Sequence, residues 1–403
     1  MKILVLNAGS STQKSCLYEV KGDFLPSSPP LPLWEGKVDW SHQQGVAEIE
    51  VKTATGEKLT EEIATDSQSE VMARLLNTIC QGSTKVINQL SEIDVVGHRV
   101  VHGGKDYRES VVITQEVKTA IAKLVNLAPA HNPVNLTGIE AVENILGEVK
   151  QVAVFDTAFH GNIPDAAAIY PGPYEWVEQD IIRYGFHGIS HQYCAERTAD
   201  ILGKDLPSLR IITCHLGNGC SLAAIKNGHS VDTTMGFTPL DGLMMGSRSG
   251  SVDPGILIYL LQQDIYTVEQ LNNLLNKASG LSGISGISSD MRQIKAAISQ
   301  GNQRAQLAFD IYVHRLCSSI GAMLASLGGL DALIFTAGIG ENAPEIRQAA
   351  CEAFEFLGIQ IDAVKNTSKP VDEDISTSDS AIKVLVIHTQ EDWQIARECY
   401  KLL

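Results

Sequence analysis

Two stretches of this chain share one pattern, in which a run of apolar residues leads into a turn rich in glycine and in amide and hydroxyl side chains. The first runs from 2–6 into the turn 7–14, and the second from 211–215 into the turn 216–221. Apolar residues resume after each turn, so each stretch is predicted to form a β-hairpin with glycine at its tip. Because glycine has no Cβ, such a tip lets backbone N–H groups converge on an anion. The pattern therefore predicts a duplicated fold that binds phosphate groups.

The rest of the chain alternates between helix and strand spacing. Segment 26–69 opens with a proline-rich stretch and is predicted to be a loop followed by peripheral strands. Beyond it helices and buried strands follow one another, which is typical of α/β architecture. The predicted helices are 70–90, 115–127, one opening at Asp253-Pro254, one opening with a capping box at Thr267, 303–327, one ending at Phe356 and one beginning at Asp392. The predicted strands are 95–101, 152–155, 332–335 and 384–387.

Composition narrows the class of protein. The chain has 403 residues, which favours two domains, and its 44% hydrophobic content is enough for full cores. Its formal net charge of −16 argues against nucleic acid as a partner, because neutralising a phosphate backbone requires lysine and arginine. Eight scattered cysteines without a CxxC pair, no signal peptide and no apolar run of membrane-spanning length predict a cytoplasmic protein with reduced thiols and no membrane association.

The turn 7–14 gathers polar side chains in the manner of a ligand-binding turn. Asn7 and Ser10 have the oxygen atoms to order a metal ion or its water molecules, and Lys14 has the charge to reach a phosphate. The GxxxxGK[ST] pattern of a P-loop is missing. An ordinary hydrophilic hairpin is the alternative, although it does not require three consecutive hydroxyl residues.

A charged residue stands in the predicted strand 95–101. Arg99 needs a partner there, because an unpaired buried charge is expensive. Two interpretations remain open: a structural ion pair, or a clamp that binds a carboxylate or phosphoryl group. The neighbouring His98 and His102 are interpreted as structural histidines.

Two further motifs place chemically active side chains at favourable positions. Asp156 follows the strand 152–155, and the carboxyl edge of an α/β sheet is where ligands bind, although a helix N-cap is an equally open role. His187 lies next to Gly188, with Gly185 and the aromatic Phe186 before it, so its backbone can approach a ligand closely.

Two predicted loops in the second half of the chain contain residues typical of anion-binding and nucleotide-binding sites. Arg248 lies in a loop of small residues before a helix N-terminus, which favours anions, with a solvated arginine as the alternative. Gly338 and Gly340 precede a predicted helix and would admit a nucleotide against the backbone, although a lone GxG is a weak signal.

Taken together these motifs resemble the acetokinase family. They follow the family order and extend from residue 2 to the C-terminal region. The matching stretches are 7–14 (NAGSSTQK), 97–104 (GHRVVHGG), 155–160 (FDTAFH), 184–188 (YGFHG), 215–219 (HLGNG), 245–250 (MGSRSG), 290–292 (DMR) and 338–342 (GIGEN).

The resemblance implies an α/β fold of two duplicated actin-like, ribonuclease H-like domains with a nucleotide cleft between them. The N-terminal domain would comprise 1–156 and about 392–403. The domain 157–391 would bind nucleotide and mediate dimerisation. The implied activity is Mg²⁺-dependent acetate kinase activity, with Mn²⁺ as a substitute metal, ATP and ADP as nucleotides, acetate and acetyl phosphate as the other substrates, and a homodimer as the assembly.

The resemblance also assigns roles to residues of this sequence. The implied catalytic residues are Arg99, Asp156, His187 and Arg248. The implied acid-binding residues are Arg99, Val101, His131, Phe186 and Pro239. The implied nucleotide-binding residues are Lys14, His215, Leu216, Gly217, Asn218, Gly219, Asp290, Met291, Arg292, Gly338, Ile339, Gly340, Glu341 and Asn342. Ser10, Ser11 and Thr12 would line the first phosphate loop, and Asn7 and Glu391 would hold the metal.

Departures from the family pattern keep alternatives open. Ala130 stands where leucine is common, which would widen the acid pocket toward propionate, and Met291 replaces a commoner aromatic residue. Propionate kinase activity is therefore one alternative. A sugar kinase of the same fold would need a base to activate a hydroxyl group. A non-catalytic, actin- or Hsp70-like nucleotide switch would lack the combination of Arg99, His187 and Arg248.

Overall fold

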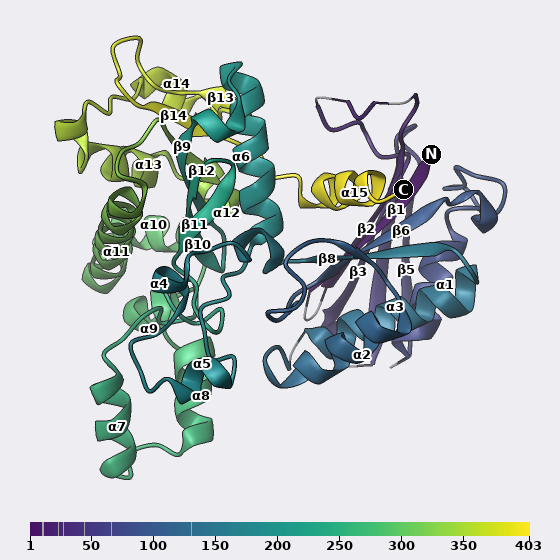
Figure 1. Ribbon diagram of the computed structural model, residues 1–403, viewed down its shortest axis with the longest axis horizontal. Helices are drawn as coiled ribbons and strands as arrows, with labels where there is room; N and C mark the ends of the chain where they lie inside the picture. Colours follow the sequence, from purple (N-terminus) through teal and green to yellow (C-terminus); the bar gives the residue numbers. More distant parts are fainter. Residues whose placement is uncertain (10–11, 23, 27, 44, 66, 130) are drawn as a thin grey trace. The chain divides into compact units, whose positions relative to one another are not determined.

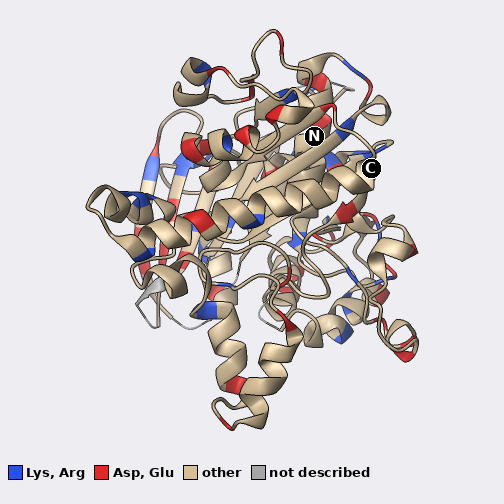
Figure 2. Ribbon diagram, turned by 90° about the vertical axis from the view of Figure 1, so that its left-hand side faces the viewer, with Lys and Arg blue, Asp and Glu red and all other residues tan. Residues whose placement is uncertain are grey.

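The computed structural model describes residues 1–403 except 10, 11, 23, 27, 44, 66 and 130, and it does not describe the side chains of 41–43. The chain divides into two compact units (Figure 1). Unit 1 comprises Met1–Gly161 and Gln390–Leu403, and unit 2 comprises Asn162–Thr389. In the view of Figure 2 acidic and basic residues are scattered over the ribbon rather than gathered in one basic stripe. No helix among the described residues is both long and apolar enough to cross a membrane.

Unit 1 is built on a mixed sheet with the strand order β5-β4-β3-β2-β1-β6-β8-β7. Strand β1 pairs antiparallel with β2 and parallel with β6, which pairs parallel with β8. The strands are β1 (Lys2–Ala8), β2 (Thr12–Glu19), β3 (Trp34–Gln43), β4 (Val46–Thr53), β5 (Lys58–Ala64), β6 (Val95–Val100), β7 (Val111–Val112) and β8 (Lys150–Phe155). The helices are α1 (Gln68–Asn77), α2 (Gln115–Lys123), α3 (Asn132–Leu146) and α15 (Glu391–Lys401), with 3-10 turns at Leu90–Glu92, Leu124–Asn126 and Ala158–His160.

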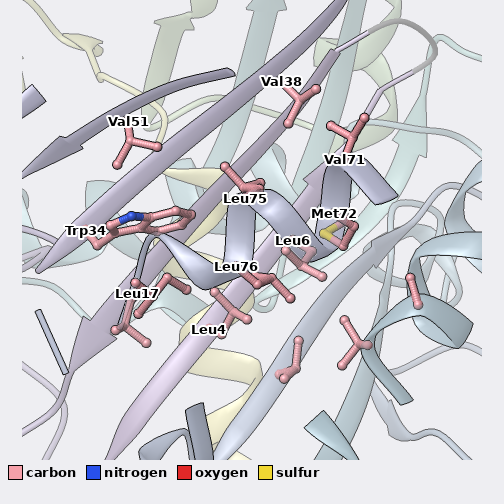
Figure 3. Packing of buried hydrophobic residues seen from close by; sticks show 14 of the residues in the cluster. Leu4, Leu6, Leu17, Trp34, Val38, Val51, Val71, Met72, Leu75 and Leu76 are labelled. Atoms are coloured by element: carbon pink, nitrogen blue, oxygen red, sulfur yellow. The ribbon is translucent and has the colours of Figure 1, made fainter. Parts of the chain in front are cut away.

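Alternate residues of the central strands face opposite layers of unit 1. Leu4 and Leu6 belong to a core that also contains Trp34 of β3 and Leu75 of α1 (Figure 3). Helix α15 covers the other face, where a Cβ at Gly97 would collide with its side chains. The C-terminal helix is therefore part of the N-terminal fold.

Unit 2 is built on a sheet with the order β11-β10-β9-β12-β14-β13. Its strands are β9 (Arg210–Leu216), β10 (Cys220–Lys226), β11 (His229–Thr233), β12 (Ala332–Thr336), β13 (Glu373–Asp374) and β14 (Lys383–Val386). Its helices are α4 (Asp165–Ala168), α5 (Glu175–Glu178), α6 (Gly188–Leu202), α7 (Pro254–Gln262), α8 (Val268–Lys277), α9 (Gly280–Ser285), α10 (Met291–Ser299), α11 (Gln303–Leu327), α12 (Ala337–Asn342), α13 (Pro344–Glu352) and α14 (Ala363–Thr367), with 3-10 turns at Leu206–Ser208 and Glu355–Leu357. Helix α6 lies on one side of this sheet and α11 with α13 on the other (Figure 1).

The two sheets repeat one topology. The order β3-β2-β1-β6-β8 in unit 1 corresponds to β11-β10-β9-β12-β14 in unit 2. In unit 1 the strand β3 pairs antiparallel with β2, and β2 with β1, and β6 and β8 run parallel to β1. In unit 2 the strand β11 likewise pairs antiparallel with β10, and β10 with β9, and β12 and β14 run parallel to β9. The predicted duplicated α/β fold is confirmed, and both predicted hairpins are present as β1–β2 and β9–β10.

Most predicted elements are present. The helices predicted to end at Leu127 and Phe356 end at Lys123 and Glu352, each followed by a 3-10 turn, and two further predictions were wrong. The helix predicted over 70–90 ends at Asn77. The hydroxyl of Thr78 donates to the carbonyl of Leu75, and Gly82 a few residues later adopts a positive φ of 74°. The stretch 338–342 was expected to be a loop, but it is helical, since α12 begins at Ala337. By contrast, α11 has the predicted bounds because Asn302 caps its N-terminus and Gly328 ends it in the left-handed conformation.

Candidate active site

Three parallel strands of unit 1 bring charged side chains to one edge of the sheet. Asn7 lies near the carboxyl end of β1, Arg99 near that of β6, and Asp156 directly after β8. The carboxyl edge of an α/β sheet is where ligands bind. Glu391 opens α15, and its charge interacts with Arg99 and Asp156. Sequence positions up to 384 residues apart are thus joined by the topology.

Arg99 and Asp156 form an ion pair, with Arg99 Nη2 2.8 Å from Asp156 Oδ2. Asp156 is buried, and Arg99 also donates to the carbonyl of Ala8. Burial opposes the charge of Arg99, but neighbouring carboxylates, Asp156 first, raise the pKa of its guanidinium. The 3-10 helix after β8 has Thr157 at its N-cap position, so Asp156 does not occupy that position. Of the two interpretations of Arg99, the structural ion pair is therefore present, and binding of a substrate anion by Arg99 stays a prediction.

Glu391 lies among other acids. Burial raises the pKa of the Glu391 carboxyl, and the charges of Asp156 and Asp392 raise it further, against the opposing effects of Arg99 and Asn7. Asn7 donates from its amide nitrogen to Asp392 over 2.8 Å. Within the described part of the chain no group of three or more His, Cys, Asp or Glu residues is arranged to hold a metal ion. Magnesium, however, commonly binds through one or two carboxylates together with water and substrate phosphates.

The nearby histidines have structural surroundings, as expected. His98 Nε2 lies 2.6 Å from Gln151 Oε1, and burial lowers the pKa of His98 to about 4. The backbone N–H of Gly104 donates to His102 Nδ1, and burial lowers the pKa of His102 also to about 4. Both imidazoles are therefore neutral near pH 7 and cannot supply positive charge to the site.

The first turn is closed by a hydrogen bond from the N–H of Gly9 to the carbonyl of Thr12 over 2.8 Å. Thr12 is half-buried and Lys14 is exposed at the start of β2. Ser10 and Ser11 lie outside the described residues. The second turn closes in the same way, from the N–H of Gly217 to the carbonyl of Gly219 over 3.0 Å.

In unit 2 the second turn packs against the loop that carries Arg248. The N–H of Gly246 donates to the carbonyl of Asn218, and a Cβ at Gly246 would collide with the Asn218 side chain. A Cβ at Gly219 would lie 3.4 Å from Arg248 Nη1 and 3.5 Å from His187 Nε2. The bare backbone of Gly219 therefore lies beside a guanidinium and an imidazole.

Arg248 has few polar partners. Its Nη1 donates to the carbonyl of Pro239 over 3.2 Å, and burial lowers the pKa of its guanidinium. Among the described residues no carboxylate pairs with it. The loop is followed by α7, which begins at Pro254 with Asp253 as its N-cap, as predicted. The start of α9 borders the loop as well, because the N–H groups of Leu281 and Ser282 donate to the carbonyls of Met245 and Gly246. The guanidinium of Arg248 supplies the positive charge of this loop.

His187 is held firmly from several sides. It adopts a left-handed conformation, φ 57°, at the N-cap of α6, which is uncommon for a residue other than glycine. Its Nδ1 lies 2.9 Å from Ser221 Oγ, and its ring stacks on that of His215 at 4.2 Å. The Nδ1 of His215 in turn lies 2.8 Å from Ser190 Oγ.

Eight of the predicted nucleotide residues, 290–292 and 338–342, lie at the start of α10 and in α12 of unit 2. Asp290 caps α10 and pairs with the exposed Arg292, whereas the Met291 side chain is buried. At α12, Ala337 is left-handed with φ 64°, and a Cβ at Gly338 would meet no atom within 4 Å. Packing therefore does not require glycine at position 338, whereas close approach of a ligand to the backbone would.

A buried arginine anchors this helix from below. Arg347, 1% exposed, donates to the carbonyls of Gly340 and Glu341, each over 2.8 Å, and to Asn366. Glu341 also pairs with His388 at 2.7 Å. The nucleotide assignment of 338–342 remains a prediction, but the stretch is rigidly supported.

The residues assigned to the apolar acid pocket are divided between the units. Val101 and His131 belong to unit 1, Phe186 and Pro239 to unit 2, and Ala130 lies outside the described residues. Val101 and Phe186 are buried. The pocket therefore remains a prediction.

Comparison with known proteins identifies the family. The family model described as the acetokinase family matches residues 2–397. The chain belongs to the acetokinase family. It is 71% identical to a protein of Nostoc punctiforme named acetate kinase, over the full length of both chains, and 62% identical to another so named from Gloeobacter violaceus, also over the full length of both.

Solved structures of the family share this fold. The crystal structure of Porphyromonas gingivalis acetate kinase is 41% identical, with a TM-score of 0.91, and the match covers 100% of this chain and 99% of that one. A propionate kinase from Francisella tularensis is 37% identical, with a TM-score of 0.89 over the full length of both. The acetokinase fold expected from the motifs is thus confirmed.

Sequence reasoning missed several residues that support the site. Ser221 contacts one ring nitrogen of His187 and one of His191. Ser190 contacts a ring nitrogen of His215, and Arg347 donates to a carbonyl of α12. One signal was available: His191 follows His187 by four residues, which is the spacing of neighbours one helical turn apart, and His187 is the N-cap of α6. The roles of Ser221 and Arg347 depend on contacts between distant segments.

Proposed function

We propose that this chain is an enzyme that reversibly transfers the γ-phosphoryl group of ATP to acetate, giving acetyl phosphate and ADP. The observation that carries the proposal is Arg248, a guanidinium beside His187 and the Gly219 backbone with no carboxylate partner among the described residues. Such a cation is suited to bind an anion. The full-length relatives named acetate kinase support acetate as the acceptor.

The proposed chemistry is a direct in-line displacement. An acetate oxygen attacks the γ-phosphorus, and because a carboxylate is already ionised near neutral pH, no general base is required. Catalysis then consists of positioning and of stabilising charge on the phosphoryl oxygens. Arg248 and His187 donate hydrogen bonds to those oxygens. Arg99, held by Asp156, binds the negative charge of the acid and of the transferred group.

The acidic group at Glu391 fits a magnesium ion. Its raised pKa and the nearby Asp156 and Asp392 mark an excess of negative charge, which a divalent cation would neutralise. We propose that Glu391 and the carbonyl oxygen of Asn7 hold the ion together with the phosphates of ATP. When bound, the ion neutralises phosphate charge. Mn²⁺ would substitute because it accepts the same oxygen ligands.

As the pH is lowered, metal affinity should begin to fall at a higher pH than it would at a glutamate with an ordinary pKa. The proton and the metal compete for the Glu391 carboxylate, and because its pKa lies above 4.5, protonation begins at a higher pH. We expect Mg²⁺ affinity, measured calorimetrically with ADP present, to fall as pH decreases through that raised pKa. Glu391→Gln should weaken binding more than about tenfold and remove this dependence, whereas Glu269→Gln, at an exposed site, should change neither. An unaltered pH profile in Glu391→Gln would remove Glu391 from the metal site.

A second acceptor, propionate, is favoured by one observation, the similarity to the propionate kinase from Francisella tularensis. The two activities share their chemistry and differ in the volume of the acid pocket. Ala130, on which the size argument depends, lies outside the described residues.

A hydroxamate assay for acyl phosphate with acetate, propionate and butyrate tests the proposal. We expect acetate to give the highest kcat/KM, and Ala130→Leu to lower propionate turnover relative to acetate. A higher kcat/KM for propionate would establish the second function. An unchanged ratio in Ala130→Leu would remove the pocket argument, and no acyl phosphate with any acid would refute both functions.

We further propose that the enzyme is a cytoplasmic homodimer and that α7 lies in the dimer interface. This helix carries no charged residue (Figure 2). None of its residues is buried. Ile256 and Tyr259, on the same side of the helix, are 50% and 58% exposed. An apolar helix of this kind gains stability when a second copy covers it.

The dimer surface is tested by light scattering after gel filtration. The wild type is expected to have the mass of two chains, and Ile256→Glu/Tyr259→Glu the mass of one. Val364→Glu, at another exposed apolar residue, is the control and should remain dimeric. A dimeric double variant would exclude α7 from the interface, and a monomeric wild type would refute the homodimer.

A further inference from the structure

A chain of buried hydroxyl and imidazole groups runs from His187 into the sheet of unit 2. Ser221 Oγ lies 2.9 Å from His187 Nδ1 and 2.7 Å from His191 Nε2. At its far end Thr213 Oγ1 lies 2.6 Å from His191 Nδ1. Ser221, His191 and Thr213 are completely buried. His187 Nδ1 and both ring nitrogens of His191 therefore face hydroxyl groups in the protein interior.

The single proton of the Ser221 hydroxyl restricts the arrangement. It can be donated to one imidazole only, so the other imidazole must donate to Ser221. In one direction His191 donates through Nε2–H to Ser221, which donates to His187 Nδ1 and leaves the proton of His187 on Nε2. In the other direction a neutral His187 has its proton on Nδ1 and a lone pair on Nε2.

The two ends of this chain distinguish the states. At the far end, only the first direction lets the Thr213 hydroxyl donate its proton to His191 Nδ1. At the near end, His187 Nε2 and Arg248 Nη1 both lie within 3.5 Å of the Cβ position that Gly219 lacks, so the two groups face the same space. The charge of Arg248 disfavours a second cation nearby, which favours a neutral His187. A neutral imidazole can donate to an anionic oxygen there only from Nε2–H.

We infer that Ser221 and His191 are positioning residues that fix His187 as the neutral Nε2–H tautomer, so that it donates to the phosphoryl group. The catalytic use of this tautomer rests on the proposed function, whereas the tautomer itself is a property of the free protein. Stacking on His215 fixes the plane of the His187 ring. The hydrogen bond with Ser221 then determines which ring nitrogen of His187 carries the proton. Neither Ser221 nor His191 touches the substrate in this account.

The tautomer can be read from long-range ¹H–¹⁵N correlation spectra of protein labelled at histidine, with His187→Gln assigning the signal. We expect His187 of the wild type to carry its proton on Nε2 at neutral pH. Ser221→Ala and His191→Phe should each produce a mixture of tautomers. They should lower kcat about tenfold or more while KM for the acid stays within about twofold.

Conservative and distant variants control the experiment. In His191→Gln the amide can still donate to Ser221, so it should restore the Nε2–H signal and most of kcat. His229→Gln, at an exposed histidine of unit 2, should change neither. An imidazolium or an Nδ1–H tautomer in the wild type, or an unchanged His187 spectrum in both Ser221→Ala and His191→Phe, would overturn the inference. Because the spectra need no substrate, failure of the proposed activity would be recognised separately.

Discussion

Arg248→Ala is expected to lower kcat by on the order of 10²-fold or more with saturating acetate and ATP, as for other lost charge-stabilising donors. The guanidinium has no competing carboxylate among the described residues, and it lies beside His187 and Gly219. Its charge is thus directed to a ligand. A 10²-fold loss corresponds to about 2.7 kcal/mol of transition-state stabilisation.

Two controls make the Arg248 result specific. Arg248→Lys should recover only part of the rate, because a single ammonium cannot reproduce the planar set of donors. Arg315→Ala, at an exposed arginine of α11, should leave kcat unchanged. Near-normal turnover of Arg248→Ala at saturating substrates would remove Arg248 from the catalytic groups.

Arg99→Ala is expected to lower kcat by a similar factor, and also to destabilise the fold. It leaves Asp156, which is 2% exposed, without its ion-pair partner. Breaking a buried pair on one side costs about 3–5 kcal/mol. Urea unfolding of Arg99→Ala should show a loss of that size.

The double variant Arg99→Gln/Asp156→Asn separates the two roles of Arg99. It replaces the ion pair by neutral side chains of similar size, so most of the stability should return while kcat stays low. Recovery of both stability and turnover would mean that the ion pair is structural only. Recovery of neither would leave the loss of turnover attributable to unfolding, and would contradict the proposed clamp as a separable function.

The local pattern of the sequence was enough to predict several elements. The two hairpins follow from glycine tips between apolar runs, and α11 from its capping residues. The helix expected over 70–90 ends early for two reasons. One is local, because Gly82 adopts a positive φ of 74° that a helix does not accommodate. The other is a tertiary contact, in which Trp34 Nε1 donates to Thr78 Oγ1 where the chain turns, and spacing along the chain does not indicate a partner 44 residues away.

The site could be predicted only in part for the same reason. Motifs identified Arg99, His187 and Arg248 one by one, and a structural ion pair at Arg99 was an open alternative, but Asp156 was not identified as its partner. The contact of Ser221 with two imidazoles depends on the packing of α6 against the sheet of unit 2, which spacing along the chain does not encode. Likewise the sequence pattern predicts only that Arg347 is a charged residue of an amphipathic helix, whereas in the structure it donates to carbonyls of α12.

The central claim is that this chain phosphorylates a carboxylate, and ³¹P NMR of the purified protein with ATP, Mg²⁺ and acetate tests it most directly. The account predicts that acetyl phosphate and ADP appear in equal amounts, and that ATP is regenerated when both are supplied. Release of inorganic phosphate without acetyl phosphate, as a nucleotide switch would give, would contradict it. So would a phosphorylated sugar formed in place of acetyl phosphate when glucose is added.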